Sequence, residues 1–230
     1  MHHLASWGQT VPLPRRVLSL DFAGVIAPKD FIDYLWYYVI PRRLSRVERI
    51  SLYEAMLKVD RAYSSIPSER LEWYIPAFWL KVLNLEASVE DLYIEALEVA
   101  EPYGDALDVI PRLAQRFNIV VVTNTPKRLV EMFLERYPQI GRNILRVFSC
   151  IDDFAIPKKR AEFYSKILKA LGIEAKHLIH VGDDPVHDVE EPTKIGIRAF
   201  LLDRRAKIGS RSVLKTLYDL EDKLETIELC

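Results

Sequence analysis

Three apolar runs in this sequence end in residues whose side chains can do chemistry. The runs cover residues 16–20, 119–122 and 178–181. The polar residues that follow them are Asp21, Thr123, Asp183 and Asp184, with Asp188 in the next turn. A short, nearly continuous apolar run is typical of a buried parallel strand, and the carboxyl ends of such strands form the ligand-binding edge of an open α/β sheet. We therefore expect these side chains to gather at one edge of a sheet.

The aspartates of this group indicate a metal ion. Carboxylates that lie close together repel one another unless a cation sits between them. Oxygen ligands are those that Mg²⁺ prefers, and Mg²⁺ serves phosphate ester chemistry by neutralising charge on the transferred group. The sequence therefore predicts a Mg²⁺ site formed by Asp21 and the aspartates of 183–188. Gly24 would let the backbone turn sharply beside the bound group.

Other side chains near this edge could complete a phosphoryl-transfer site. The hydroxyl of Thr123 can donate a hydrogen bond to a phosphoryl oxygen. Lys158 or Lys159, between the third expected strand and the next helix, can neutralise a second oxygen and restrain the Asp21 carboxylate. Asp21 would then act as a covalent nucleophile through an aspartyl intermediate.

An alternation of strands and helices would position these residues. The five expected strands cover residues 16–21, 119–123, 147–150, 178–181 and 198–202. Helical patterns separate the later strands, and repeated strand–helix units form a parallel sheet with helices on both faces. The predicted fold class is therefore α/β, with a doubly wound parallel sheet.

The alternation is interrupted between the first and second strands. Residues 29–103 show helical patterns and no convincing buried strand, and Ser45 and Ser88 each begin a pattern typical of a helix N-terminus. Aromatic residues are frequent there, which favours a packed core between helices, with a few of them available to line a substrate pocket. We expect one domain formed by 15–28 and 104–230, with a helical domain of 29–103 inserted in it.

These motifs resemble the four motifs of the haloacid dehalogenase-like (HAD) hydrolase superfamily. The segment Leu20-Asp21-Phe22-Ala23-Gly24-Val25 resembles the first motif, and Val122-Thr123-Asn124 resembles the second. The segment that begins at Lys158 resembles the third-motif lysine and its helix, and 180–189 resembles the fourth motif. The resemblance covers about 17–205. It implies a Rossmann-like core and identifies the helical insertion as a cap, which in this family closes over the site and selects the substrate.

The resemblance also implies a role for each matching residue. Asp21 would be the nucleophile, assisted by Thr123 and Lys158. Lys158 is preferred over Lys159 because it places residues 162–164 on the usual helix pattern of the family. The implied Mg²⁺ ligands are Asp21, the carbonyl of Ala23, Asp183 and, as outer ligands or as partners of Lys158, Asp184 and Asp188. The implied phosphate-binding residues are Phe22, Ala23, Gly24, Thr123, Asn124 and Lys158.

Ala23 departs from the family pattern. Family phosphatases carry a second aspartate at this position, as general acid for the leaving group and base for the attacking water, and such catalysis contributes roughly 10²–10⁴-fold. We therefore expect a Mg²⁺-dependent phosphohydrolase that acts on a small phosphorylated metabolite with a good leaving group, or one that borrows an acid from elsewhere. Candidates for that acid are Tyr34, Glu54, Asp60 and His187.

Two alternatives remain open. One is chemistry like that of phosphonoacetaldehyde hydrolase, a branch that also has alanine here and activates its substrate through a Schiff base to a cap lysine, which would be Lys58. The other is a HAD fold that binds a phosphorylated ligand or a partner protein without catalysis. The presence of Asp21, Thr123, Lys158 and Asp183 together favours an enzyme over the second alternative.

The amino-acid composition favours some cellular locations and excludes some classes of binding partner. The net charge of −1 gives no basic field for nucleic acid, and the apolar stretch 31–40 is too short to span a bilayer. Two cysteines and a start without a signal-peptide pattern predict a reducing, cytoplasmic location. Scarce asparagine and glutamine among many charged residues favour a thermophilic source. We expect a monomer or homodimer that binds neither nucleic acid nor a membrane.

Overall fold

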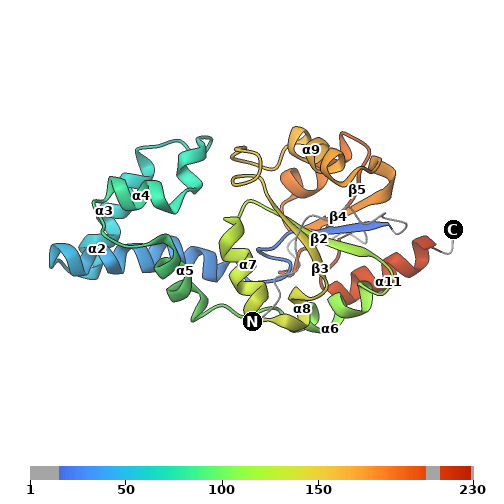
Figure 1. The fold of residues 1–230 in the computed structure, drawn as a ribbon, viewed down its shortest axis with the longest axis horizontal. Coiled ribbons are helices and arrows are strands. Elements are labelled where there is room, and N and C mark those ends of the chain that lie inside the picture. Colours follow the sequence, from blue (N-terminus) through green and yellow to red (C-terminus); the bar gives the residue numbers. More distant parts are fainter. Residues whose placement is uncertain (1–15, 206–212, 229–230) are drawn as a thin grey trace, which may run out of the picture.

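The molecule is built on a five-stranded parallel sheet (Figure 1). It is known from a computed structural model that describes residues 16–205 and 213–228; the first residues, on which the signal-peptide expectation rests, lie outside this range. The strands are β1 (Val17–Leu20), β2 (Asn118–Thr123), β3 (Ile144–Ser149), β4 (Leu178–Gly182) and β5 (Arg198–Leu201). Helices cover both faces of the sheet, and the predicted doubly wound α/β fold is confirmed.

Both faces of the sheet are apolar because successive side chains of a strand point to opposite sides. Leu18 and Leu20 of β1 lie in the core of one face, and Val17 lies in the core of the other. The helices packed on the first face are α6 (Gly104–Leu113), α7 (Lys127–Arg136) and α11 (Leu217–Glu228). The second face is covered by α9 (Ala161–Leu171), and Ser19 lies on this side of β1.

The strand order β3-β2-β1-β4-β5 creates a switch point beside β1. From β1 the chain proceeds through β2 to β3 on one side, and it then crosses to β4 and β5 on the other side. In open α/β sheets, ligands bind outside the carboxyl ends of the strands at such a point. The remaining short elements of this region are α8 (Pro138–Gly141), η3 (Ala175–His177), η4 (Pro185–Glu190) and α10 (Glu191–Thr193).

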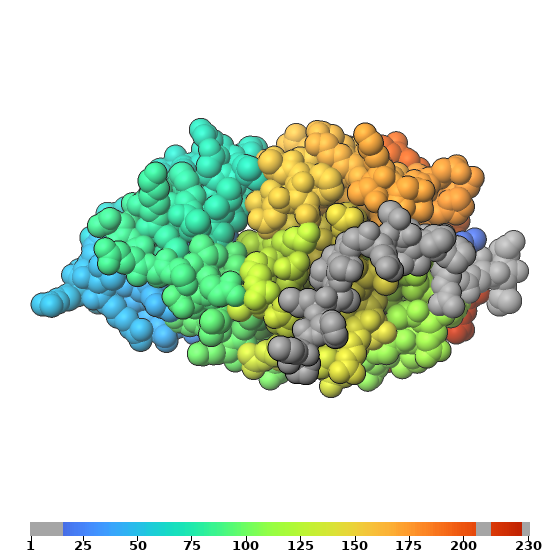
Figure 2. Space-filling model, viewed as in Figure 1, coloured from blue at the N-terminus to red at the C-terminus, as the bar shows by residue number. Residues whose placement is uncertain are grey.

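Residues 29–103 form helices and no strand, as the sequence predicts, and they lie to one side of the sheet (Figures 1 and 2). We refer to this segment as the helical insertion. Its elements are α1 (Asp30–Tyr34), η1 (Leu35–Val39), α2 (Ile40–Glu48), α3 (Leu52–Ser64), η2 (Leu71–Tyr74), α4 (Pro76–Val82) and α5 (Val89–Leu97). No helix of residues 16–205 or 213–228 is long and apolar enough to cross a bilayer.

The helix starts in the insertion differ in part from expectation. Ser88 caps α5 in a capping box with Asp91, as predicted. Ser45 does not start a helix, because it lies inside α2 and its hydroxyl donates to the carbonyl of Ile50 (2.7 Å). The capping box belongs instead to Ser51 and Glu54 at the start of α3. The prediction at Ser45 was therefore wrong by less than two turns.

Aromatic side chains form the core of the insertion, as the frequency of these residues favours. The rings of Tyr63 and Trp79 meet edge to face with centroids 4.7 Å apart, and Trp36 and Trp73 pack against Tyr63. Their polar atoms are paired within the cluster: Trp79 Nε1 donates to the carbonyl of Trp73 (2.8 Å) and the Tyr63 hydroxyl to that of Trp36 (3.1 Å). These aromatic residues therefore hold the helices together.

The insertion also contacts the sheet domain near residue 155 (Figure 2). Leu71, Tyr74 and Ile75 pack on the same apolar cluster as Phe154 and Ile156, which follow β3. This contact places the insertion beside the loop that leads into α9.

Candidate active site

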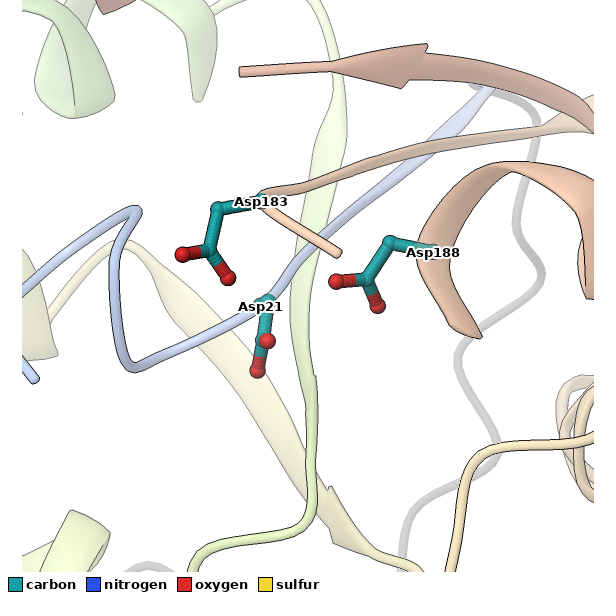
Figure 3. A group of neighbouring side chains, drawn as sticks. All are labelled: Asp21, Asp183 and Asp188. Carbon is teal, nitrogen blue, oxygen red and sulfur yellow. The ribbon is translucent and has the colours of Figure 1, made fainter. Parts of the chain in front are cut away.

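The carboxyl ends of β1, β2 and β4 bring polar side chains to the switch point. Asp21 follows β1 directly, and its N–H donates to the carbonyl of Val181 in β4 (2.8 Å). Thr123 is the last residue of β2, and Asp183 follows β4. Asp188 lies on η4, and its carboxylate points toward those of Asp21 and Asp183 (Figure 3). The structure thus brings the Asp21 carboxylate together with those of Asp183 and Asp188, which lie 162 and 167 positions later in the sequence.

The three carboxylates lie close enough to share a cation. One oxygen each from Asp21, Asp183 and Asp188 lies within 4.8 Å of the others. Two glycines allow this approach, because a Cβ on Gly24 would stand 2.3 Å from an oxygen of Asp183 and one on Gly182 would stand 2.1 Å from the carboxyl carbon of Asp188. Gly24 also has φ +86°, a conformation that other residues rarely adopt. This set of hard oxygen donors fits Mg²⁺.

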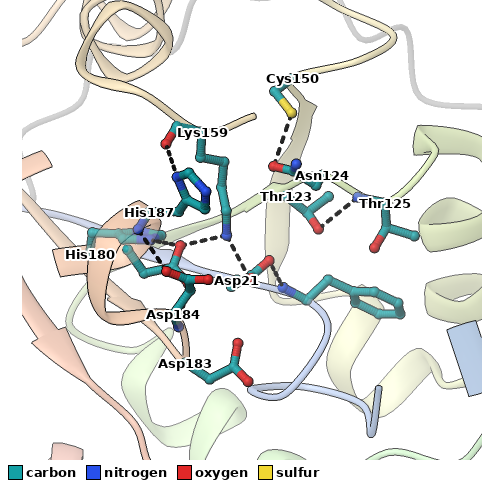
Figure 4. A network of polar contacts seen from close by, with 12 residues as sticks. Asp21, Thr123, Asn124, Thr125, Cys150, Lys159, His180, Asp183, Asp184 and His187 are labelled. Atoms are coloured by element: carbon teal, nitrogen blue, oxygen red, sulfur yellow. Dashed lines mark hydrogen bonds and ion pairs between the residues drawn. The ribbon is translucent and has the colours of Figure 1, made fainter. Parts of the chain in front are cut away.

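Lys159 is the lysine of the site. Its ammonium lies 2.6 Å from Asp21 Oδ2 and 2.5 Å from Asp188 Oδ1, and the residue is buried (Figure 4). Lys158, which the sequence analysis preferred, points elsewhere and pairs with Glu69 of the insertion at 3.3 Å. The preference is corrected because the side chains of the two lysines point to different partners, and only that of Lys159 reaches Asp21.

The buried ion pairs keep Lys159 and Asp188 charged. Burial opposes the charge on Lys159, but Asp188 and Asp21 outweigh it and raise the pKa of Lys159 above its usual value. Burial also acts to raise the pKa of Asp188, yet the charge of Lys159 and a hydrogen bond from His180 hold that pKa well below its usual range. For Asp21 burial dominates and raises the pKa, with Lys159 offsetting part of the rise. The structure therefore holds a positive ammonium between two buried carboxyl groups.

Asp184 has a structural role. One of its carboxylate oxygens accepts the N–H groups of Val186 and His187, both at 2.9 Å, so the side chain caps the N-terminus of η4. The adjacent N–H of Asp184 itself donates to Asp188 Oδ2 (3.0 Å). Asp184 thus positions the turn that carries Asp188, and its expected role as an outer ligand of the metal stays a prediction.

Two residues expected to bind phosphate, Thr123 and Asn124, differ in whether their side chains still have a hydrogen-bonding group available. The hydroxyl of Thr123 accepts the N–H of Thr125 (3.1 Å) and keeps its own proton to donate. Both ends of the Asn124 amide are bound: its nitrogen donates to the carbonyl of Pro157 (3.0 Å), and its oxygen accepts from the Cys150 thiol (3.1 Å). Asn124 therefore fixes the loop that leads to Lys159.

The loop after Asp21 is tightly bound to itself. The N–H of Phe22 donates to Asp21 Oδ1 (2.7 Å), and the N–H of Gly24 donates to the carbonyl of Ala27 (2.7 Å). Ala23 forms a bridge with Ala27 and is partly exposed. The Ala23 methyl cannot exchange a proton, which is the property that the sequence analysis emphasised.

Three residues escaped sequence reasoning. The Lys29 ammonium lies 2.7 Å from Asp183 Oδ2 at the exposed side of the site. His180, a buried residue of β4, contacts Asp188. Arg204, after β5, donates to the carbonyls of Gly24 (3.0 Å) and Val25 (2.8 Å). No local pattern marks these residues, because the partners of Lys29 and Arg204 are distant in the sequence and the contact of His180 with Asp188 depends on how the chain turns after β4.

Arg204 joins the nucleophile loop to the chain that returns from the insertion. Besides its two carbonyl bonds, its guanidinium makes a two-pronged ion pair with Asp105 (2.8 and 3.0 Å). It also lies over the ring of Tyr103, 3.7 Å from the centroid. Because Tyr103 and Asp105 lie at the start of α6, this one side chain fixes both connections between the insertion and the sheet.

The four residues considered as replacements for an acid at position 23 differ in their distance from the site. Glu54 is held in the capping box of α3, and Tyr34 stacks on Tyr38. Asp60 is exposed on α3. His187 Nδ1 bonds with the carbonyl of Lys159 (3.1 Å), so His187 is the candidate nearest to the site.

Two further side chains are unsuited to nucleophilic roles at this site. Lys58 is half exposed on α3 and forms an ion pair with Glu48 within the insertion. Burial raises the pKa of the Cys150 thiol to about 12, which keeps it protonated at neutral pH. Asp21 is therefore the nucleophile candidate with a charged partner in place.

The model of the haloacid dehalogenase-like hydrolase family matches residues 21–196. The chain belongs to this family. The predicted superfamily is thereby confirmed, and the protein is a HAD-like hydrolase. The matched range begins at Asp21 and includes all residues of the site described above except Arg204.

Individual HAD proteins are similar over nearly the whole chain. Enolase-phosphatase E1 from Yarrowia lipolytica (strain CLIB 122 / E 150) is 29% identical over 226 residues, which cover 87% of this chain and 97% of that protein. A HAD phosphatase from Thermococcus onnurineus has a TM-score of 0.71 with 25% identity, covering 91% and 97% of the two chains. The HAD-hydrolase YfnB from Bacillus subtilis shares the fold, with a TM-score of 0.64, 22% identity and coverage of 92% and 99%.

Proposed function

We propose that this protein is a Mg²⁺-dependent phosphohydrolase that acts on a small phosphorylated metabolite through an aspartyl-phosphate on Asp21. The observation that carries the proposal is the arrangement of Asp21, Asp183 and Asp188 around one point, with Lys159 bound to two of them. The phosphatase names of the Yarrowia and Thermococcus relatives support the same reaction class.

The residues divide the work as follows. Asp21 and Asp183, with the carbonyl of Ala23, would hold the cation, and Asp188 would border it. Bound Mg²⁺ supplies positive charge that neutralises phosphoryl oxygens. A carboxylate oxygen of Asp21 attacks phosphorus while the ester P–O bond breaks and the leaving group departs with the bonding electrons. Thr123 donates its hydroxyl to a phosphoryl oxygen, and Lys159 restrains Asp21. Water then attacks phosphorus while the P–O bond to Asp21 breaks; Asp21 leaves as the carboxylate, and both protons of the water end on the released phosphate.

Ala23 sets the substrate preference in this proposal. No side chain at position 23 can protonate the leaving oxygen, so esters whose leaving groups are stable as anions should react best. The four asparagines, three glutamines and two cysteines of the chain support a cytoplasmic enzyme from a thermophile. The expectation of a monomer or homodimer is part of the proposal.

Hydrolysis of p-nitrophenyl phosphate tests the proposal, because this ester needs little acid assistance. We expect turnover that requires Mg²⁺, disappears with a chelator and returns when Mg²⁺ is added back. Asp21→Asn should abolish turnover, whereas Asp222→Asn, an exposed carboxyl on α11, should leave it unchanged. Turnover that survives in Asp21→Asn would refute the nucleophile assignment.

The variant Ala23→Asp tests the role of position 23 by a gain of activity. The new carboxyl should raise turnover of an alkyl phosphate far more than that of p-nitrophenyl phosphate, since only the alkyl leaving group needs a proton, and general acid catalysis contributes roughly 10²–10⁴-fold. Equal effects on the two esters would contradict the explanation given for Ala23.

A further inference from the structure

Behind the carboxylates lies a polar network that is closed to solvent. It consists of Ser19, Tyr164, His180 and Asp188, all with no exposed surface. Lys159 connects this network to the nucleophile, and Figure 4 shows Lys159 and His180 beside Asp21. Buried polar groups are costly unless every hydrogen bond is made. The network therefore needs a reason to be retained on an otherwise apolar face of the sheet.

The contacts of His180 define its hydrogen-bond roles. Its Nδ1 lies 2.8 Å from the Ser19 hydroxyl, which is directly opposite on β1. Its Nε2 lies 3.1 Å from Asp188 Oδ1 and 3.0 Å from the Tyr164 hydroxyl. The Tyr164 hydroxyl has a carbonyl acceptor at His187 (2.8 Å).

The carboxylate of Asp188 decides which ring nitrogen must carry a proton. A carboxylate accepts hydrogen bonds and cannot donate them, so Nε2 must carry a proton that it donates to Asp188. The Ser19 hydroxyl can donate to Nδ1 (2.8 Å) or to the carbonyl of Ile179 (3.3 Å), so the contacts of Nδ1 are compatible with the proton on Nε2, and Tyr164 donates to the carbonyl of His187. With the proton on Nδ1 instead, the lone pair of Nε2 would face an oxygen of Asp188 at 3.1 Å.

We infer that His180 is a positioning residue, which donates from Nε2 to Asp188 and so holds Asp188 against Lys159 and Lys159 against the Asp21 nucleophile. The hydrogen bond is inferred from geometry alone. The expected effect of His180 on turnover rests on the proposed function. Asp188 Oδ1 is the shared atom, because it contacts both His180 and Lys159. Partners one shell beyond the reacting groups typically contribute 10–100-fold to activity or metal affinity.

Two amide variants separate the two nitrogens. The amide nitrogen of glutamine lies as many bonds from Cα as Nε2 of histidine, and that of asparagine as many as Nδ1. His180→Gln therefore keeps a hydrogen-bond donor for Asp188. His180→Asn keeps a polar group that can bond to Ser19 but loses the donor for Asp188. His177→Asn, an exposed position just before β4, is the matched control.

We expect His180→Asn to lower kcat for p-nitrophenyl phosphate about 10- to 100-fold with little change in KM. His180→Gln should retain most of the wild-type kcat, and both variants should lose melting temperature to a similar extent because both give up ring packing. Equal losses of kcat in the two variants, or a wild-type kcat in His180→Asn, would overturn the inference in favour of a purely structural role.

Nuclear magnetic resonance of protein labelled with ¹⁵N-histidine gives a readout that does not depend on turnover. The chain has five histidines, and the His180 signal is the one that disappears in His180→Gln. Its Nε2 should carry the proton, and Asp188→Asn should shift that signal. A proton found on Nδ1 alone would overturn the inference. A wild-type protein without turnover would refute the proposed function, while these spectra would still decide the hydrogen bond.

Discussion

The sheet edge and the helical insertion bury opposite kinds of side chain. At the sheet edge, charged groups lie inside the protein and neutralise one another: Asp21, Lys159 and Asp188 are all buried. In the insertion, aromatic rings such as Trp79 fill the interior, and ion pairs such as Lys58–Glu48 lie at the surface. Because buried charges rarely stabilise a fold, their place at the sheet edge indicates catalysis, whereas the insertion is organised by packing.

Removing the central ammonium should have the largest effect. Lys159→Met leaves Asp21 and Asp188 as uncompensated buried carboxylates, which we expect to cost about 3–5 kcal/mol of unfolding free energy. Turnover should fall about 10²–10³-fold, as when a preorganised charged contact is lost. Urea unfolding and p-nitrophenyl phosphate hydrolysis measure the two effects.

Lys158→Met is the matched variant for that experiment. Its side chain contacts only Glu69 among the ion pairs described, so stability and turnover should stay near wild type. A larger loss of activity in Lys158→Met than in Lys159→Met would reverse the assignment of the two lysines.

Removing an aromatic ring from the insertion tests the other half of the comparison. Trp79→Ala should cost about 3–5 kcal/mol, because the indole is fully buried and packs on Tyr63. Val82→Ala, at a half-exposed position at the end of the same helix, should cost far less. Chemical unfolding of both proteins checks this, and similar losses would mean that the insertion is not held together by its aromatic core.

Arg204→Lys should have an intermediate effect. A lysine cannot bond two carbonyls and both oxygens of Asp105 at once, so about 1–3 kcal/mol of stability should be lost with some polar groups left unpaired. Arg112→Lys, which alters an exposed arginine paired with Glu221, should change stability by less than about 1 kcal/mol. Thermal unfolding of the two variants would contradict this view if their melting temperatures fell equally.

The smallest effect is expected at Lys58. Lys58→Met removes an exposed ion pair with Glu48 and should change stability by no more than about 0.5 kcal/mol, with unchanged turnover. Loss of turnover would contradict the comparison and would favour the lysine-dependent chemistry considered from the sequence.

Strand ends were the most predictable part of the molecule. Each buried strand is a short apolar run, and the polar residue that follows it is placed by the sheet itself, so Asp21, Thr123 and Asp183 could be assigned to one edge. The helical insertion was visible because 29–103 lacks any such run. Helix starts were less certain, since Ser45 and Ser51 head the same Ser-x-x-Glu pattern and tertiary packing decides between them.

Side-chain direction and long-range pairing could not be predicted. The choice between Lys158 and Lys159 depends on how the loop is held, and Asn124 holds it through the carbonyl of Pro157, a contact across 33 residues. His180 reads as one more residue of a buried strand until Asp188 and Ser19 are seen beside it. Such contacts depend on tertiary geometry, which local sequence patterns do not encode.

The late position of Arg204 in the chain determines when its hydrogen bonds can form during synthesis. The ribosome makes the nucleophile loop and the whole insertion before it makes residue 204. The carbonyls of Gly24 and Val25 can bond to Arg204 only near the end of translation. We therefore expect the loop that follows Asp21 to be among the last segments to complete its hydrogen bonds.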